Sequence, residues 1–143
     1  MLVKDVMTPS VKTITPQETV QEAGRLMRDM GLACLIVVDK GKLVGIITEM
    51  DLVKGVIAED KKASLVKIKE VMTKEVIMID PEATVEEAAE VMTDHKVKKL
   101  PVVQDSKLIG LLTSMDIVAS EPKFIEQLSQ LFLMPKPKKP IAG

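Results

Sequence analysis

The pattern of hydrophobic and polar positions predicts a series of short, buried strands. Nearly unbroken apolar runs of this length are typical of strands that are covered on both faces. Four of the runs form two close pairs, each joined by a short polar turn (DKGK or QDSK), which indicates two hairpins. The predicted strands are 11–14, 35–39, 43–48, 76–79, 100–104 and 108–113.

Helical periodicity separates these strands and also follows each hairpin. In residues 19–31 the apolar positions recur at the spacing of one helix face, and Thr19 with Glu22 has the form of a capping box. Thr84 with Glu87 has the same form. A further helix is expected after each hairpin, in the segments MDLVKGVIAED and MDIVASE.

The elements recur because the chain contains one sequence pattern twice. A shift of 65 positions aligns residues 3–52 with residues 68–117 without a gap, and 22 of the 50 paired positions are identical. GIITEMD at 45–51 thereby meets GLLTSMD at 110–116. The unit is too long for a solenoid repeat, so two copies indicate a pseudo-symmetric pair.

Each copy is expected to fold as β-α-β-β-α, and the two copies to pack sheet to sheet in an α/β (α+β) protein. A single copy of about 55 residues would be marginally stable, whereas two copies can bury a shared core. We assign residues 1–60 to the first copy and 61–120 to the second. Residues 121–143 are expected to add an amphipathic helix, with Phe124 and Phe132 on its apolar side, and a disordered basic tail.

The composition argues against several classes of function. Lys and Arg number 20 against 21 Asp and Glu, so no excess charge attracts nucleic acid or a membrane surface. Trp and Tyr are absent and Phe occurs twice, which leaves no platform for stacking bases. No apolar run reaches the roughly 18 residues of a membrane span, and the N-terminus lacks a signal-peptide pattern. We therefore expect a cytoplasmic protein.

No catalytic or metal site is expected either. His95 is the only histidine and is expected at the surface, at the end of a helix. Cys34 is the only cysteine, which fits a reducing compartment, and its apolar neighbours predict a buried, inert thiol. Since the chain has no nucleophile–base pair, no glycine-rich phosphate loop and no metal-ligand spacing, no enzyme activity and no required cofactor are predicted.

Asp51 and Asp116, which end the repeated G-h-h-T-x-x-D motif, are the best candidates for ligand contact. A carboxylate can accept both hydrogens of a cis-diol, as found in ribose. Thr48 and Thr113 stand at the start of a predicted helix, where a phosphate group is favoured. The motif therefore offers a phosphate end and a ribose end one helical turn apart.

The alternative interpretation of T-x-x-D is a capping box without a ligand. The chain uses Glu22 and Glu87 in its other two boxes, and the longer Glu is expected to reach back to the N-cap amide better than Asp. The choice of Asp in both T-x-x-D motifs therefore favours ligand contact, while the capping interpretation stays open.

The repeated motifs resemble the CBS domain, named for cystathionine β-synthase, in its tandem arrangement, the Bateman module. The motifs are V-M-T-x-x-V, P-x-x-T-V-x-E-A, L-P-V-V and G-h-h-T-x-x-D, in this order and twice within residues 1–120. The first copy departs at Ile36, where the second has Pro101, which should change a strand edge and not the fold. The resemblance implies a regulatory module that binds AMP, ADP, ATP or S-adenosylmethionine, forms a homodimer and acts on a partner protein.

The resemblance also implies two clefts, each built from the T-x-x-D of one copy and the first strand of the other. Aliphatic side chains would enclose adenine in each cleft. Cleft A is expected to comprise Ser10, Val11, Lys12, Leu32, Ala33, Lys98, Leu111, Thr113 and Asp116. Cleft B is expected to comprise Ile46, Thr48, Asp51, Glu75, Val76, Ile77, Val97 and Lys98.

The two clefts are expected to differ in their preference for phosphate. The family often places a phosphate-binding side chain at the position of Lys98, and the first copy has Ala33 there. Cleft A, with Lys98, Thr113 and Asp116, is therefore predicted to be the better nucleotide site. Alternatively, Lys98 belongs to a solvated helix end whose cations offset the helix dipole.

Two other functions remain open at this point. The chain could be a ligand-free dimerisation or protein-interaction module, with the helix after residue 121 and the basic tail as its docking element. Binding of nucleic acid through the lysine clusters and the tail is a third, minor alternative, which would show a steep dependence on salt.

Overall fold

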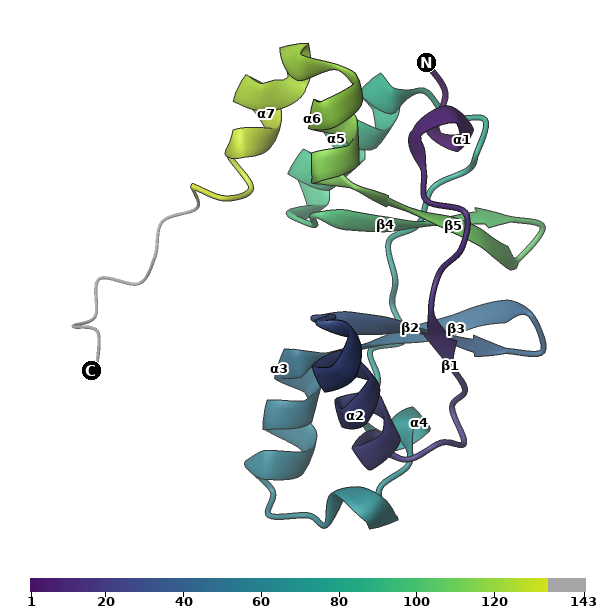
Figure 1. The fold of residues 1–143 in the computed structure, drawn as a ribbon, viewed down its shortest axis with the longest axis vertical. Helices are drawn as coiled ribbons and strands as arrows, with labels where there is room; N and C mark the ends of the chain where they lie inside the picture. The colour runs from purple at the N-terminus through teal and green to yellow at the C-terminus, as the bar shows by residue number, and fades with distance from the viewer. Residues whose placement is uncertain (134–143) are drawn as a thin grey trace.

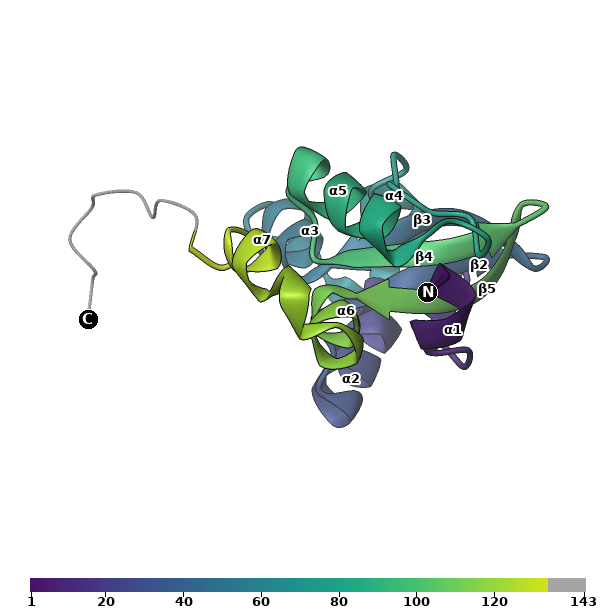
Figure 2. The same ribbon diagram turned by 90° about the horizontal axis from the view of Figure 1, so that it is seen from above.

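The structure, a computed structural model that describes residues 1–133, consists of two similar halves, one above the other in Figure 1. Each half contains a hairpin and a set of helices on its outer face, so that the two hairpins face each other at the centre (Figures 1 and 2). The first half contains β1 (Thr13–Ile14), α2 (Val20–Met30), β2 (Cys34–Asp39), β3 (Lys42–Thr48) and α3 (Glu49–Leu52). The second contains α5 (Val85–His95), β4 (Lys99–Gln104), β5 (Lys107–Thr113) and α6 (Ser114–Ser120).

The strands have the order β1-β2-β3-β5-β4, and both hairpins are antiparallel. Strand β1 pairs with β2 in parallel, and the two hairpins are linked by one pair, Lys42 with Lys107. The register shifts at the same place in each hairpin, between Val37 and Val38 and between Val102 and Val103. The predicted α+β fold, with two pseudo-symmetric copies packed sheet to sheet, is confirmed.

The predicted strand 76–79 is wrong. Only Ile79 pairs with the hairpin, in a single bridge to Val102, whereas Thr13 and Ile14 form a two-residue strand in the first copy. The reason is Pro101, which takes the place of Ile36 and has no N–H to donate to a neighbouring strand. The exchange of Ile36 for Pro101 thus shortens a strand edge and leaves the fold unchanged.

The start of each copy packs on the core of the other copy. Helix α1 (Val3–Val6) buries Val3 completely in the second core, and α4 (Ile68–Val71) buries Ile68 completely in the first. Backbone hydrogen bonds fix both, from Val3 N to Ala83 O at 2.8 Å and from Ile68 N to Glu18 O at 2.9 Å. Residues 7–12 and 72–77, here named the first and second strap, therefore cross from one half to the other.

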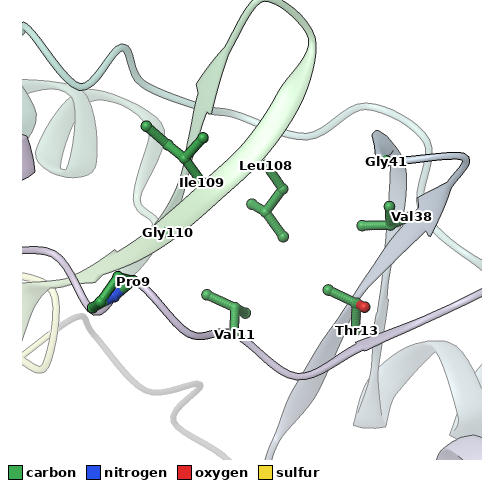
Figure 3. A pocket seen from close by; sticks show the side chains of 8 residues that line it. All are labelled: Pro9, Val11, Thr13, Val38, Gly41, Leu108, Ile109 and Gly110. Carbon is green, nitrogen blue, oxygen red and sulfur yellow. The ribbon is translucent and has the colours of Figure 1, made fainter.

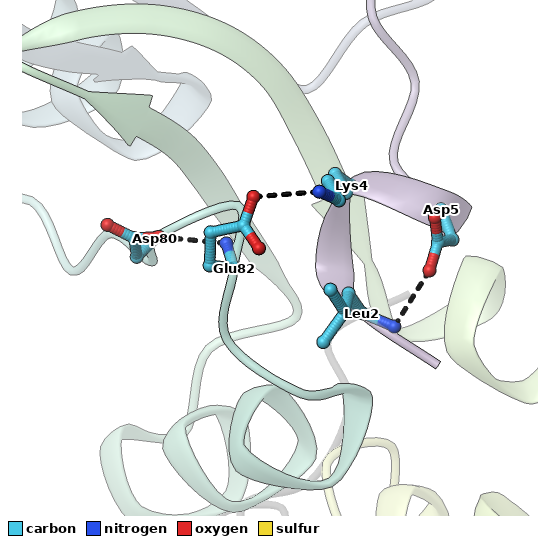
Figure 4. Close-up of polar contacts among 5 residues, drawn as sticks. All are labelled: Leu2, Lys4, Asp5, Asp80 and Glu82. Atoms are coloured by element: carbon cyan, nitrogen blue, oxygen red, sulfur yellow. Dashed lines mark hydrogen bonds and ion pairs between the residues drawn. The ribbon is translucent and has the colours of Figure 1, made fainter.

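Polar contacts at the N-terminus add to the attachment of α1 (Figure 4). Lys4 Nζ lies 2.8 Å from Glu82 Oε1, Leu2 N donates to Asp5 Oδ2 at 3.0 Å, and Glu82 N donates to Asp80 Oδ1 at 2.8 Å. The hydrogen bond to Glu82 raises the pKa of Lys4. Because both side chains of this ion pair are exposed, the burial of Val3 and not the ion pair holds the helix in place.

The first copy ends in an irregular helix. Helix α3 continues as a π-helical turn, Val53–Ile57, where a side chain on Gly55 would come within 2.7 Å of Val71. A short 3₁₀ turn, Ala63–Leu65, then leads into α4. The absence of a side chain at Gly55 thus allows α4 to pack closely against this turn.

The predicted C-terminal helix is present as a 3₁₀ turn, Pro122–Phe124, followed by α7 (Ile125–Ser129). Phe124, Leu128 and Leu131 are buried in the second core, so most of its apolar side is not a free docking surface. Phe132, predicted on the same side, is instead 53% exposed. The predicted disordered tail, 134–143, lies outside the described residues. No helix within residues 1–133 is long and apolar enough to cross a membrane.

Candidate functional site

The repeated motifs meet where each strap crosses the hairpin of the other copy. Thr8 N donates to Leu111 O, and Leu111 N to Thr8 O, both at 2.9 Å. A side chain on Gly110 would lie 2.6 Å from Met7 Sδ and 2.9 Å from Thr8 O. The V-M-T motif of the first copy therefore needs the glycine of G-h-h-T-x-x-D in the second.

The second strap repeats this arrangement. Ile46 N donates to Thr73 O at 2.9 Å, and Thr73 N donates to Ile46 O at 2.8 Å. A side chain on Gly45 would lie 2.8 Å from both Met72 Sδ and Thr73 O. The two motifs are thus contact partners across the copies, which explains why they recur at the same spacing.

A first cavity of about 240 Å³ lies beside the first strap and corresponds to cleft A. Five residues predicted for cleft A line it: Ser10, Val11, Lys12, Leu32 and Leu111. Its other lining residues, which the sequence interpretation missed, are Thr8, Met30, Cys34, Ile36 and Lys99. The predicted Ala33, Lys98, Thr113 and Asp116 are not among its lining residues.

A second, more open cavity of about 490 Å³ corresponds to cleft B. Four residues predicted for cleft B line it: Ile46, Thr48, Val97 and Lys98. Its other lining residues are Ala33, predicted for cleft A, and Cys34, Glu49, Met50, Lys96 and Lys99. The predicted Glu75, Val76 and Ile77 are not among its lining residues, and Asp51 lines a neighbouring charged cavity with Lys54, Glu59, Lys61 and Glu70.

Both T-x-x-D motifs are complete capping boxes. Thr48 N donates to Asp51 Oδ2 at 2.9 Å, and Thr113 N donates to Asp116 Oδ2 at 3.0 Å. In each box the aspartate N also donates to the threonine hydroxyl at 3.1 Å. The capping interpretation is therefore correct for both motifs, and their recurrence alone does not identify a ligand site.

In the two boxes formed by Thr and Glu, Glu does not make the better cap. Thr19 N is 3.5 Å from Glu22 Oε1, and the predicted box of Thr84 and Glu87 contains only the bond from Glu87 N to the threonine hydroxyl. Elsewhere Glu does reach the amide closely, as in the bond from Lys67 N to Glu70 Oε2 at 2.6 Å, so side-chain length does not decide which acid caps a helix. Asp at this position therefore needs no ligand to explain it.

The two capping aspartates differ in the acceptors that they leave free. The hydroxyl of Thr73 donates to Asp51 at 3.0 Å from Oδ1 and 3.2 Å from Oδ2. The equivalent Thr8 makes no such bond, and within residues 1–133 no donor reaches Asp116 Oδ1. Capping and ligand contact are thus compatible at Asp116, whereas at Asp51 a ligand would compete with Thr73. The repeated V-M-T motif was the signal that could have identified both threonines.

The lysines gather around the second cavity rather than the first. Lys96, Lys98 and Lys99 line the second cavity, whereas Lys12 and Lys99 line the first. Lys98 Nζ also lies 4.5 Å from the ring centroid of Phe132, at a distance typical of a cation–π contact. The cations are therefore distributed differently from the expectation that cleft A would hold Lys98.

The remaining candidate residues have simple structural roles. His95 is exposed, as predicted, and its Nδ1 lies 3.1 Å from Val91 O. Cys34 is half-buried at the junction of the two cavities, so the prediction of a buried thiol is wrong. In the described part of the chain, no group of three or more His, Cys, Asp or Glu side chains could hold a metal ion.

A further cavity of about 220 Å³ lies on the other side of the first strap (Figure 3). Pro9, Val11 and Thr13 face Leu108 of strand β5 across it, with Gly41 in the hairpin turn beyond. Thr13 contributes the only side-chain polar atom of the lining. With so few polar groups, this space has little means to orient a ligand.

Comparison with known proteins supports the assignment made from the motifs. The model of the CBS domain family matches the chain twice, over residues 3–58 and 68–122. The CBS domain-containing protein YhcV of Bacillus subtilis is 31% identical over 119 residues, which are 83% of this chain and 84% of YhcV.

Two further similarities concern proteins with a known activity or ligand. An inosine-5′-monophosphate dehydrogenase of Korarchaeum cryptofilum is 41% identical over 121 residues, which are 84% of this chain but 23% of the dehydrogenase. The CBS domain pair of protein MJ0100, in complex with 5′-methylthioadenosine and S-adenosyl-L-methionine, has a TM-score of 0.72 and 34% identity, covering 84% of this chain and 98% of the pair. The two matches of the family model, the duplicated fold and the paired cavities lead to one conclusion: this chain belongs to the CBS domain family and carries two CBS domains in tandem.

Proposed function

We propose that this protein is a regulatory module that binds an adenosine compound between its two copies and changes its action on a partner protein accordingly. The observation that carries the proposal is the pair of cavities at the junction, each lined by side chains of both copies. The domain pair of MJ0100 binds two adenosine compounds and supports this ligand class. AMP, ADP, ATP and S-adenosylmethionine are the candidates.

In the first cavity, the aliphatic side chains of Val11, Leu32, Ile36 and Leu111 would enclose the adenine ring. Its volume is below the roughly 300–1,000 Å³ of most ligand pockets, so the base would fill it and the ribose and phosphate would lie at its edge. Asp116 Oδ1, which is free to accept hydrogen bonds, would then hold the ribose hydroxyls at the edge of the cavity. The full proposed set is Ser10, Val11, Lys12, Leu32, Ile36, Lys99 and Leu111 from the cavity lining, with Thr113 and Asp116 beside it.

The second cavity is proposed as the site that prefers phosphate. Three lysines line it, and Thr48 stands beside them at the start of helix α3. Ile46 and Val97 supply apolar contacts for a base. This reverses the order expected from the sequence, because the side chain of Lys98 serves this cavity.

Calorimetric titration with AMP, ATP and S-adenosylmethionine tests the proposal. At least one compound should bind, and Asp116→Asn should weaken binding in the first cavity about tenfold, since a hydrogen bond to a charged group contributes about 1.5–3 kcal/mol. Asn keeps an oxygen that can cap the helix, so the variant should remain folded. Asp51→Asn is the matched control and should have a smaller effect, because Thr73 already occupies that carboxylate. Absence of both heat and thermal shift with all three compounds at millimolar concentration would reject the proposal.

A second candidate function is a ligand-free dimerisation module. Four apolar side chains are exposed on α3, on the π-helical turn and on α6: Met50, Val53, Ile57 and Met115. A contiguous patch of such side chains would favour self-association, and a homodimer is compatible with both functions. Sedimentation distinguishes them when combined with the titration, since this second function requires a dimer that binds none of the compounds.

A further inference from the structure

We infer that Lys99 is one cation shared by the two cavities, so that an anionic ligand in one cavity weakens the binding of a second anionic ligand in the other. This inference rests on the proposed function and extends it to the combination of ligands that the protein accepts. The favoured combination is one phosphate-bearing adenosine compound together with one uncharged or cationic adenosine compound.

The position of Lys99 follows from the duplication. Cys34 and Lys99 are equivalent residues of the two copies, separated by the same 65 positions as the motifs. Each begins the first strand of its hairpin, where Cys34 pairs with Thr48 and Lys99 pairs with Thr113. Lys99 Nζ lies 4.0 Å from Cys34 Sγ. Because equivalent residues touch here, the pseudo-twofold axis passes between them.

A residue on this axis borders both sites. Among all lining residues, Cys34 and Lys99 are the two that border both the first and the second cavity. The two equivalent side chains differ in chemistry, since the first copy contributes a thiol and the second an ammonium group. If both copies had a lysine at this position, each cavity could have a lysine of its own. This chain has one lysine here for both cavities.

The other charged residues cannot replace Lys99 for both cavities. Lys12 lines the first cavity alone, while Lys96 and Lys98 line the second alone, together with the carboxylate of Glu49. The ammonium group of Lys99 carries a single positive charge, which two phosphates reaching it from the two cavities would have to share. The second phosphate would therefore gain little from Lys99, whose charge the first phosphate already offsets, and the first phosphate would repel it. An uncharged adenosine compound experiences neither effect.

The test is a titration in which NMR signals of the methyl groups of Leu111 and Ile46 report on the first and the second cavity separately. With AMP as the probe, one cavity should fill first and the other at a concentration about tenfold higher. Lys99→Met should raise the dissociation constant of the first event about tenfold and change the second less than twofold, so that the two curves approach each other. With adenosine as the probe, the variant should leave both curves within twofold of the original protein.

Two matched variants separate a shared lysine from a lysine that serves one cavity. Lys99→Arg keeps the charge and should keep the separation between the two AMP curves. Lys96→Met should weaken AMP at Ile46 and should not weaken AMP at Leu111. Since Lys99 is half-buried at a strand end, Met of similar length is accommodated, and a thermal melt checks that the variant is folded.

The outcomes distinguish this inference from the function on which it rests. If AMP fills both cavities and Lys99→Met alters neither curve, or weakens both equally, the proposed function stands and the shared role of Lys99 is rejected. If neither set of signals responds to AMP or to adenosine at millimolar concentration, both the adenosine function and the shared role are rejected.

Discussion

At the scale of single residues, the glycine of the G-h-h-T-x-x-D motif has a clear physical role. Gly110→Ala would place its Cβ 2.9 Å from the backbone oxygen of Thr8, a residue that is held to Leu111 by two backbone hydrogen bonds. The strap must then move away from strand β5, and we expect a loss of about 1–3 kcal/mol in the free energy of unfolding. Urea denaturation followed by circular dichroism measures it, since the chain has no Trp or Tyr.

Gly24→Ala is the matched control for this prediction. Gly24 lies inside helix α2, and a Cβ there would meet no atom within 4 Å. The substitution should raise the free energy of unfolding by about 0.5–1 kcal/mol, the usual difference between Ala and Gly in a helix. Equal effects of the two substitutions would show that the close approach of the strap does not determine the residue at position 110.

Individual residues also show where inference from the sequence reaches its limit. The importance of Asp51 and Asp116 was visible in the repeat, yet hydrogen-bond geometry was needed to show that both cap helices. The difference between them depends on Thr73, which is distant in sequence and reaches only Asp51. Lys98 was assigned by position in a motif, but side-chain direction decided which cavity it lines. Such choices depend on contacts between copies, which no local pattern encodes.

At the scale of elements, hydrophobic periodicity predicted the hairpins and the long helices, because each buries a face large enough to leave a pattern. The short edge strand was predicted incorrectly in the second copy. Its formation depends on the neighbouring strand, where Pro101 offers no N–H, and not on the apolar run 76–79 itself. Edge strands are thus specified by their partners as much as by their own residues.

Ile36→Pro tests this explanation in the first copy. The second copy shows that the hairpin accepts proline at this position, so the fold should persist while Thr13 and Ile14 lose part of their pairing. We expect a loss of about 1 kcal/mol, close to the net value of one hydrogen bond, and faster amide exchange in β1. Val37→Pro, one residue further, removes an N–H on the side of strand β3 and should cost considerably more. A similar cost for both variants would contradict the explanation.

At the scale of the whole molecule, the duplication was evident from the sequence, whereas the exchange of the N-terminal segments was not. The two copies present nearly equivalent surfaces, so the segment V-K-D-V-M-T has the same pattern whether it packs on its own copy or on the other. Only the three-dimensional path of the straps distinguishes the two arrangements. The path also makes the halves interdependent, since each core is completed by a helix from the other copy.

This interdependence predicts that the two copies unfold together. Ile68→Ala removes a completely buried side chain from the first core, although residue 68 belongs to the start of the second copy. We expect a loss of about 2–4 kcal/mol and a single cooperative transition in urea, seen by circular dichroism and by the methyl signals of Leu35 and Leu100. Val3→Ala removes a buried side chain from the second core and should likewise destabilise both halves.

If either variant produced two transitions, with Leu35 and Leu100 losing their native signals at different urea concentrations, the straps would not couple the two cores. A ligand bound against the first strap would then have no direct mechanical path to the second half, and the regulatory signal would have to pass through the hairpins alone.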